Sequence, residues 1–277
     1  MKLKLTKNGY QILECINCDQ AYTNIIVSEK EVKQIYSDSY FFEGGAGYDD
    51  YTTEKNLLIK RAEYFAKKIA PFTTTGKVLD VGAACGFILK GFTNKGWTGS
   101  GIEPNGTMVH RAQHIEKMNV IQGTLENNAL ETKYDLVVLI QVVAHLYDLE
   151  NAMTQLNKLL NPGGHVLIET WDKSSISAKF FGIDWHEYSP PGTLNFFTRN
   201  SLKTLMRQNH FSLVKEGCPK KFIHSRHARS LIKHKLSESN SLRWLAGIYK
   251  LIPKNILIRY PSEDLFWALY KKTTNNE

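Results

Sequence analysis

Short apolar runs alternate with longer amphipathic stretches along most of the chain. Runs typical of buried strands lie at 78–79, 97–102, 119–122, 134–140, 165–170, 211–215 and 264–270, and helical periods lie at 53–70, 108–117, 148–160 and 199–208. Strands that alternate with helices form βαβ units, whose strands are parallel. The pattern therefore predicts an α/β fold with a mostly parallel sheet, helices on both faces, and a ligand at the carboxyl ends of the strands.

The same pattern divides the chain into parts. Alternating patches around Cys15 and Cys18 predict an N-terminal β-ribbon, and an aromatic and glycine-rich stretch over residues 31–52 predicts a loop after it. The predicted parts are 1–52 as the ribbon and an aromatic lid loop, 53–218 as the core, 219–258 as a basic helical insertion that forms a lid, and 259–277 as the last core strand and tail.

A turn of small residues follows the first core strand, in the stretch KVLDVGAACGFIL from Lys77 to Leu89. Small residues at 82, 84 and 86 allow a ligand to lie against the backbone, and the helix start that follows offers unpaired N–H groups. A dinucleotide site has the spacing G-x-G-x-x-G, so the spacing here argues against a pyrophosphate ligand. Glu103 ends the next strand, where a carboxylate can accept hydrogen bonds from both hydroxyls of a ribose. The alternative is a solvated acid at a strand end.

Four segments, VLDVGAACG, GIEP, YDLVVLIQVVAHLYD and LNPGGHVLIE, resemble in order and interval the motifs of the class I S-adenosylmethionine-dependent methyltransferases. The resemblance covers roughly residues 54 to 217 and the last strand. It implies a Rossmann-like class I methyltransferase fold with a seven-stranded, mostly parallel sheet, and S-adenosyl-L-methionine as the cofactor. The residues that it assigns to the cofactor are Asp80, Gly82, Ala84 and Gly86 in the loop, Glu103 and Pro104 at the ribose, Thr124 and Leu125 at the adenine, and Gln141 and Val142 facing the methionine.

The chain departs from the family pattern at two of these positions. Ala84 stands where the family often has glycine, and Gly123-Thr124 stands where it often has an acid. A small residue suits the first position, whereas the second change leaves adenine contacts less well defined than ribose contacts.

Two histidines are candidates for a general base. His145 lies in IQVVAHLYD, which resembles the VLEHL-type stretch of a branch that includes ubiquinone-biosynthesis O-methyltransferases, with Ala144 in place of the usual Glu. His186 lies in a later segment that resembles part of the family's acceptor pocket. The alternatives are a buttress beside the cofactor loop for His145 and a structural role for His186.

Two tyrosines at the end of the aromatic stretch, Tyr48 and Tyr51, are candidates for cofactor contacts. A lid that closes over the site would keep water out and align the acceptor with the methyl group. The alternative is that these rings pack the ribbon onto the core.

Cysteine usage bears on metal binding and on the compartment. Cys15 and Cys18 resemble half of the zinc site of methyltransferases from sugar and natural-product pathways. Zinc prefers four ligands, so no metal is expected unless a partner chain or Cys218 completes the site. The four cysteines form no disulfide framework in a chain of 277 residues, and the longest apolar stretch is too short to span a bilayer. These features predict a cytoplasmic protein.

The net charge of +8 comes from one segment, because residues 220–254 hold nine Lys and Arg and a single acid, Glu238. Such a segment fits an anionic acceptor, a membrane surface or RNA, and an anionic small molecule is favoured. The default alternative is a lid helix with a solvated basic face.

The predicted function is an S-adenosylmethionine-dependent methyltransferase, a monomer or homodimer, that methylates the oxygen of a metabolite, sugar or natural-product intermediate. One rival is an RNA methyltransferase. However, the chain after the strand predicted at 134–140, Ile140-Gln141-Val142-Val143, lacks the Asn/Asp-Pro-Pro-aromatic motif of enzymes that methylate base amino groups. A second rival is a non-catalytic protein that retains the fold.

Overall fold

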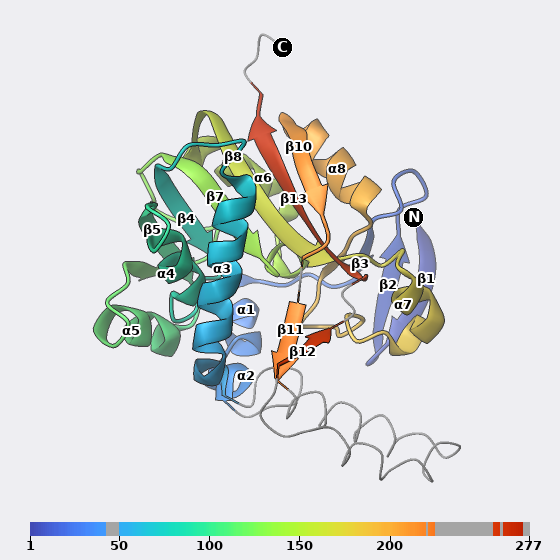
Figure 1. The fold of residues 1–277 in the computed structure, drawn as a ribbon. Helices are drawn as coiled ribbons and strands as arrows, with labels where there is room; N and C mark the ends of the chain where they lie inside the picture. Colours follow the sequence, from blue (N-terminus) through green and yellow to red (C-terminus); the bar gives the residue numbers. More distant parts are fainter. Residues whose placement is uncertain (43–49, 220, 225–256, 261–262, 274–277) are drawn as a thin grey trace. The chain divides into compact units, whose positions relative to one another are not determined.

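The computed structural model describes residues 1–42, 50–219, 221–224, 257–260 and 263–273 (Figure 1). The chain divides into two compact units, Met1–Gly217 with Asp264–Glu277, and Cys218–Glu263. The larger unit holds two sheets, and the smaller one holds a two-stranded ribbon.

A seven-stranded sheet forms the centre of the larger unit. In spatial order its strands are β10 (Phe211–Gly217), β13 (Leu265–Lys272), β8 (Leu160–Trp171), β7 (Tyr134–Ile140), β4 (Lys77–Val81), β5 (Thr98–Glu103) and β6 (Val120–Gln122). Neighbouring strands are parallel except at β13, which runs antiparallel to both β8 and β10. The mostly parallel seven-stranded sheet predicted from the sequence is confirmed.

Helices cover both faces of this sheet (Figure 1). They are α3 (Lys55–Ile69), α4 (Phe87–Thr93), α5 (Gly106–His114), α6 (Leu149–Leu159) and α8 (Arg199–Gln208). Side chains of α3, α4 and α5 share a core with Leu136 and Val138 of β7, whereas those of α6 and α8 share one with Val137 and Leu139. Burying each such side chain stabilises the fold by roughly 1.5–3 kcal/mol, so the continuous apolar run of β7 requires cover on both sides.

A second sheet joins the N-terminus to the chain that follows β8. Its antiparallel strands are β1 (Lys2–Lys7), β2 (Tyr10–Glu14), β3 (Ala21–Thr23) and β9 (Asn195–Phe196). Glu14 strengthens this junction, because its carboxylate lies 2.6 Å from Nζ of Lys173 and also contacts Lys4. Burial alone would raise the pKa of Glu14, but the bonds from Lys173 and Lys4 outweigh it and lower the pKa to about 2.

The loop expected over 31–52 instead contains two helices, α1 (Glu29–Ile35) and α2 (Asp38–Phe42), and the 3-10 helix η1 (Tyr51–Glu54). A capping box starts α1: the Ser28 hydroxyl accepts from the Glu31 N–H, and the Glu31 carboxylate accepts from the Ser28 N–H at 2.7 Å. The loop prediction is wrong for these helices. It followed the aromatic and glycine content of the stretch and overlooked the S-x-x-E capping signal of Ser28 and Glu31.

The remaining described elements are short. They are η2 (Val143–His145), α7 (Ile176–Phe181), η3 (Gly182–Asp184), and, in the smaller unit, β11 (Lys221–His224) paired antiparallel with β12 (Leu257–Tyr260). The helices predicted within 219–258 fall largely on 225–256, outside the described residues.

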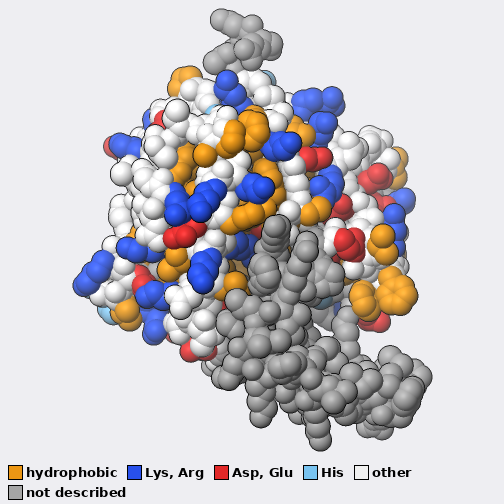
Figure 2. All heavy atoms as spheres, viewed as in Figure 1, with side chains coloured by type: hydrophobic (Ala, Val, Ile, Leu, Met, Phe, Trp, Pro, Cys, Tyr) orange, Lys and Arg blue, Asp and Glu red, His pale blue; other side chains and the backbone are white. Residues whose placement is uncertain are grey.

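Charged side chains of both signs are mixed on the face that α3 covers (Figure 2). Lys55 of α3 contacts Glu116 at 2.6 Å, and Lys95 contacts Glu63 of α3 at 3.8 Å. Each of these two contacts pairs a lysine with an acid.

Candidate active site

The loop after β4, residues 82–86, leads into α4 with an unusual backbone. Gly82, Ala84 and Gly86 all have positive φ angles, of 68°, 44° and 78°. A Cβ atom on Gly82 would lie 2.7 Å from Cγ2 of Val142, so a side chain does not fit beside the chain that follows β7. Ala84 in this left-handed region costs about 1–2 kcal/mol, which the surrounding packing must offset.

Glu103, the last residue of β5, contacts this loop directly. Its Oε2 accepts the Ala84 N–H at 2.9 Å, and its Oε1 accepts the Asn105 N–H at 2.9 Å. Each oxygen keeps a lone pair, so the carboxylate can still accept hydrogen bonds from two hydroxyls. Burial raises the pKa of Glu103 to about 7, although the two N–H donors oppose this shift.

Asp80, within β4, is engaged inside the fold. Its Oδ2 accepts the Leu89 N–H of α4 at 3.1 Å, and the residue is 2% exposed. Burial raises its pKa to about 8, with the Leu89 N–H opposing the shift and the nearby Glu103 adding to it. The contact fixes the loop between β4 and α4, and a direct cofactor contact from Asp80 stays a prediction.

Gln141 and Val142 follow β7 next to the loop. Gln141 has a φ of 61°, and its N–H donates to the Glu169 carbonyl at 2.8 Å. Its side-chain Nε2 is buried and has no hydrogen-bond partner in the described structure. An orphaned buried amide costs about 1–3 kcal/mol, so Nε2 is suited to donate to a ligand at this edge of the sheet.

The residues predicted for the adenine lie after β6. Leu125 is buried in the core on the α6 side, and Oγ1 of Thr124 lies 3.5 Å from the Tyr147 hydroxyl. Pro104, predicted for the ribose, uses its carbonyl to accept from Gln122 at 3.1 Å. Glu126, two residues after Thr124, was not singled out from the sequence; it is buried and its carboxylate accepts the Tyr147 N–H at 2.9 Å.

His145 ends η2, just beyond β7. Its Nδ1 lies 2.8 Å from the Gly192 carbonyl oxygen, and its ring meets the Tyr36 ring edge-on, with centroids 5.8 Å apart. Burial lowers the pKa of His145, and the hydrogen bond to Gly192 opposes this shift. The imidazole is thus held in one orientation and favours its neutral form.

The structure gives His186 a different setting. Its side chain is 44% exposed, its Nε2 lies 3.4 Å from Glu187, and its ring meets the Trp171 ring edge-on with centroids 4.6 Å apart. An exposed imidazole beside a carboxylate keeps water as a competing partner, so this setting favours His145 over His186 as the base.

Of the two predicted lid tyrosines, Tyr48 lies outside the described residues. Tyr51 is buried in η1 and stacks on Phe87, the first residue of α4, with centroids 5.6 Å apart. It shares a cluster with Ala84 and Met108, so it supports the loop from behind, and a cofactor contact from Tyr51 stays a prediction.

Two residues that the sequence did not single out connect α1 to this region. Asn105 caps α5, and its Nδ2 donates both to the Tyr36 carbonyl at 2.9 Å and to Asp38 at 3.0 Å. The Tyr36 hydroxyl donates to the Gly192 carbonyl at 3.0 Å. An asparagine after Glu103-Pro104 is a signal for a helix start that the sequence does offer. Its hydrogen bonds to the end of α1 depend on tertiary packing, so the sequence does not predict them.

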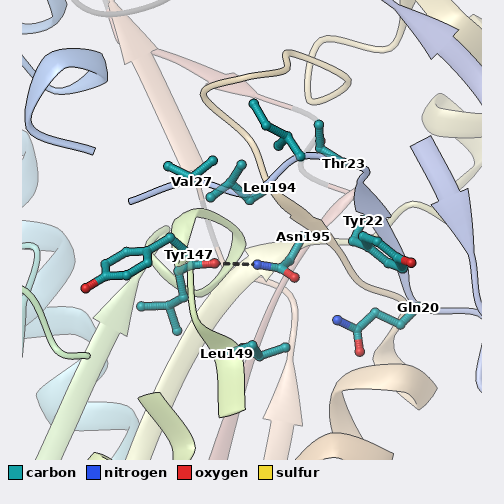
Figure 3. Close-up of a pocket in the computed structure, with 10 residues that line it drawn as sticks. Gln20, Tyr22, Thr23, Val27, Tyr147, Leu149, Leu194 and Asn195 are labelled. Carbon is teal, nitrogen blue, oxygen red and sulfur yellow. Dashed lines mark hydrogen bonds between the residues drawn. The ribbon is translucent and has the colours of Figure 1, made fainter. Parts of the chain in front are cut away.

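A cavity of about 230 Å³ lies beside the chain that follows His145 (Figure 3). It is lined by Gln20, Tyr22, Thr23, Ile25, Val27, Leu146, Tyr147, Leu149, Leu194 and Asn195. Nδ2 of Asn195 donates to the Leu146 carbonyl at 2.7 Å, the bond drawn as a dashed line in Figure 3. The lining mixes apolar side chains with amide and hydroxyl groups, which suits an uncharged part of a small molecule.

Within the described residues, neither the ligand cluster of a metal site nor a membrane-spanning helix is present. Cys15 and Cys18 lie between β2 and β3, and among the described residues no three His, Cys, Asp or Glu side chains gather as a metal site would need. No helix in the described ranges is long and apolar enough to cross a membrane.

The order of the sheet, the loop after β4 and the acid that ends β5 together define a class I methyltransferase fold. A family model described as a methyltransferase domain matches residues 54–216, more than half of the chain. The chain therefore belongs to this family of S-adenosylmethionine-dependent methyltransferases, for which S-adenosylmethionine is the methyl donor.

Solved structures agree on the fold. The methyltransferase of Haloferax volcanii, in complex with the Trm112 methyltransferase activator, is similar with a TM-score of 0.57 and 12% identity, over 82% of this chain and 96% of that one. A methyltransferase from Thermotoga maritima is similar with a TM-score of 0.51 and 16% identity, over 80% of this chain and 94% of that one.

Curated relatives resemble part of the chain. The ubiquinone biosynthesis O-methyltransferase of Vibrio atlanticus is 29% identical over 111 residues, which are 38% of this chain and 47% of that protein. The enzyme of the same name from Rickettsia bellii is 26% identical over 117 residues, 40% of this chain and 48% of that protein. The chain thus spans about half the length of the curated relatives that it matches.

Proposed function

We propose that this protein transfers a methyl group from S-adenosylmethionine to an oxygen of a small molecule. The observation that carries the proposal is the meeting of the 82–86 loop, the Glu103 carboxylate and the orphaned Gln141 amide at one edge of the sheet. The family match supports the methyl donor, and the similarity to O-methyltransferases supports oxygen as the accepting atom.

The residues at this edge fit the methionine, ribose and adenine parts of S-adenosylmethionine. Gly82 has no Cβ, so the methionine part can lie against the loop backbone. The free lone pairs of Glu103 can accept the two ribose hydroxyls, and Nε2 of Gln141 can donate to an oxygen of the methionine part. Thr124 and Leu125 are the residues that we propose for the adenine.

When bound, S-adenosylmethionine supplies a methyl group attached to a positively charged sulfur. The chain's own contribution is then alignment of the acceptor, exclusion of water and removal of the acceptor's proton. Glu103 and Gln141 would serve alignment, and His145 would take the proton.

The hydrogen bond of His145 determines which ring nitrogen can act as a base. A carbonyl oxygen can only accept, so Nδ1 carries the ring proton that is donated to Gly192, and Nε2 holds the lone pair. Because burial lowers the pKa of His145, the ring is neutral at neutral pH. Nε2 can therefore take the proton that the acceptor hydroxyl loses as its oxygen becomes methylated.

The acceptor is proposed to be a small molecule whose uncharged part lies in the cavity of Figure 3. Support comes from the lining, which is apolar with amide and hydroxyl groups, and from Leu146 and Tyr147, which directly follow His145. An anionic group elsewhere on the acceptor stays a prediction, because it rests on the basic segment 220–254.

Calorimetry with S-adenosylhomocysteine tests the cofactor site, and product analysis tests the reaction. The wild type is expected to bind with a stoichiometry of one, and Glu103→Ala is expected to bind at least about tenfold more weakly, the loss of one or two charge-assisted hydrogen bonds. Absence of binding, or unchanged binding in Glu103→Ala, would contradict the site.

Acceptor panels of matched hydroxyl and amino compounds then separate the chemistries, with release of S-adenosylhomocysteine as the signal. Methylation of hydroxyl compounds supports the proposal, and methylation of amines alone contradicts the choice of oxygen. Cofactor binding without turnover on either panel would favour the non-catalytic alternative.

A further inference from the structure

The Gly192 carbonyl oxygen receives two hydrogen bonds from opposite parts of the chain. One comes from Nδ1 of His145 at 2.8 Å, and the other comes from the Tyr36 hydroxyl at 3.0 Å. Both lone pairs of this oxygen are therefore used, and the carbonyl is held from two sides. The position of the Gly192 carbonyl, which accepts the hydrogen bond from His145, thus depends on Tyr36.

Tyr36 also contacts His145 itself. The two rings meet edge-on at 83°, with centroids 5.8 Å apart, and Tyr40 packs against Tyr36 in the same manner at 5.1 Å. Tyr36 is the C-cap residue of α1, so its place depends on how the end of that helix is held. Edge-to-face aromatic contacts restrict rotation of the imidazole in addition to the hydrogen bond.

Asn105 holds the end of α1 and the ribose acid at the same time. Its backbone N–H donates to Glu103 Oε1, while its Nδ2 donates to the Tyr36 carbonyl and to Asp38. Its Oδ1 accepts the Met108 N–H at 2.8 Å as the cap of α5. The backbone N–H, Nδ2 and Oδ1 of Asn105 thus all have hydrogen-bond partners, and Asn105 is 7% exposed.

We propose that Tyr36 is a positioning residue for His145, and that Asn105 anchors Tyr36 to the acid at the cofactor site. Through this connection Glu103 and His145 belong to one network, which holds the imidazole with its proton at Nδ1 and its lone pair at Nε2. The inference rests on the proposed function for its purpose, but the arrangement that it describes can be measured without turnover.

The measurement is the tautomer of His145 by ¹⁵N NMR of the imidazole rings in the full chain. His145→Gln identifies its signals among the nine histidines. The wild type is expected to show protonation at Nδ1. Tyr36→Leu removes both the ring and the hydroxyl, so the Nε2-protonated fraction of His145 is expected to rise severalfold. Tyr36→Phe keeps the ring contact, so its Nε2-protonated fraction is expected to lie between those of the wild type and Tyr36→Leu.

Asn105→Ser tests the anchor without removing the helix cap, since serine caps helices about as well as asparagine. It loses both bonds from Nδ2 and is expected to shift the His145 tautomer in the same direction as Tyr36→Leu. Thr107→Val is the matched control, because it removes only the 3.0 Å bond from the exposed Thr107 hydroxyl to Asp38.

Binding of S-adenosylhomocysteine separates positioning from loss of fold. A shifted tautomer with full binding stoichiometry supports the proposal. Protonation of wild-type His145 at Nε2, or an unchanged tautomer in both Tyr36→Leu and Asn105→Ser, overturns it. If Tyr36→Leu does not fold, Tyr36→Phe and Asn105→Ser decide the matter, and an unchanged tautomer in both then overturns it.

Kinetics add a second readout once an acceptor is known. Misplacement of a base by about 1 Å can cost roughly 100-fold in rate, so Tyr36→Leu is expected to lower kcat by up to this factor with little change in cofactor affinity. A wild type that fails to bind S-adenosylhomocysteine would contradict the proposed function, whereas the NMR result would still test the His145 arrangement.

Discussion

The backbone N–H of Ala84 donates to Oε2 of Glu103 at 2.9 Å, which joins the loop after β4 to the end of β5. The contact holds Ala84 at a positive φ of 44° and turns the carboxylate toward the loop. One side chain therefore supports the shape of the loop and offers lone pairs to a ligand beside it.

Glu103→Gln tests this double role more finely than removal of the side chain. The amide keeps an accepting oxygen for Ala84 but loses the charge and one acceptor, so binding of S-adenosylhomocysteine is expected to weaken by about 1–2 kcal/mol, roughly five- to thirtyfold. Calorimetry gives the affinity, and Glu131→Gln, at an exposed position, is the matched control. Equal affinities for both variants would rule out Glu103 as a ribose ligand.

Asp80 and Glu103 make the stability of the cofactor-free protein fall as pH rises from about 4 to about 8. The pKa of Asp80 rises from 3.8 to about 8, and that of Glu103 rises from 4.5 to about 7. A carboxyl group with a higher pKa in the folded chain binds more protons when folded, so its stabilising effect is present at low pH and is lost as pH rises through this window.

We therefore expect the difference in Tm between Asp80→Asn and the wild type to grow in favour of the variant as pH rises from about 4 to about 8. The asparagine keeps an oxygen to accept the Leu89 N–H and carries no charge to bury. Thermal unfolding at a series of pH values, without ligand, measures this difference. A Tm difference that does not vary with pH would contradict the raised pKa of Asp80.

The sequence predicts elements well where burial alone determines them. The strand predicted at 134–140 and the helix predicted at 199–208 coincide with β7 and α8, because an apolar run or an amphipathic period states directly which side chains are covered. The family motifs likewise predict the 82–86 loop and Glu103. The loop directly follows the strand β4, and Glu103 ends the strand β5.

Contacts between distant segments could not be predicted in the same way. The Thr23 hydroxyl bonds to the Thr193 carbonyl at 2.8 Å beside the β3–β9 pair, and no local pattern links two such short strands. Tyr36 lies near His145 because it ends α1, a helix that a capping box starts. The composition of this stretch indicates a loop, so the position of Tyr36 could not be predicted. The roles of Tyr36 and Asn105 emerge from tertiary packing, which single-residue preferences do not encode.

Gly82→Ala is expected to damage both stability and cofactor binding. The alanine would pay about 1–2 kcal/mol for its left-handed backbone and would add a clash at 2.7 Å with Cγ2 of Val142. Gly9→Ala is the matched control, because Gly9 also has a positive φ, of 81°, but a Cβ there meets no atom within 4 Å.

Denaturant unfolding and calorimetry with S-adenosylhomocysteine measure the two effects. Gly9→Ala should lose only the backbone cost and keep full affinity, while Gly82→Ala should lose more stability and also affinity. The double variant Gly82→Ala with Val142→Ala should regain part of the stability, since it removes the clashing methyl groups. Equal losses for Gly9→Ala and Gly82→Ala would contradict a close approach between the loop and Val142.

His145→Gln is expected to separate catalysis from cofactor binding. Loss of a general base typically costs about 10²- to 10⁴-fold in kcat, whereas the affinity for S-adenosylhomocysteine should stay unchanged because the ring is assigned to the acceptor. His186→Gln, at a side chain that is 44% exposed, serves as the comparison and should keep most of the activity.

The pH dependence of kcat provides the second test of His145. Burial lowers its pKa from the ordinary value of 6.5, so the neutral, active form should persist below pH 6.5 and the rate should fall only at still lower pH. This acidic limb should be absent from the residual activity of His145→Gln and present in His186→Gln. If His186→Gln loses the limb instead, the proton is taken by His186, and the hydrogen bond between His145 and Gly192 serves the fold alone.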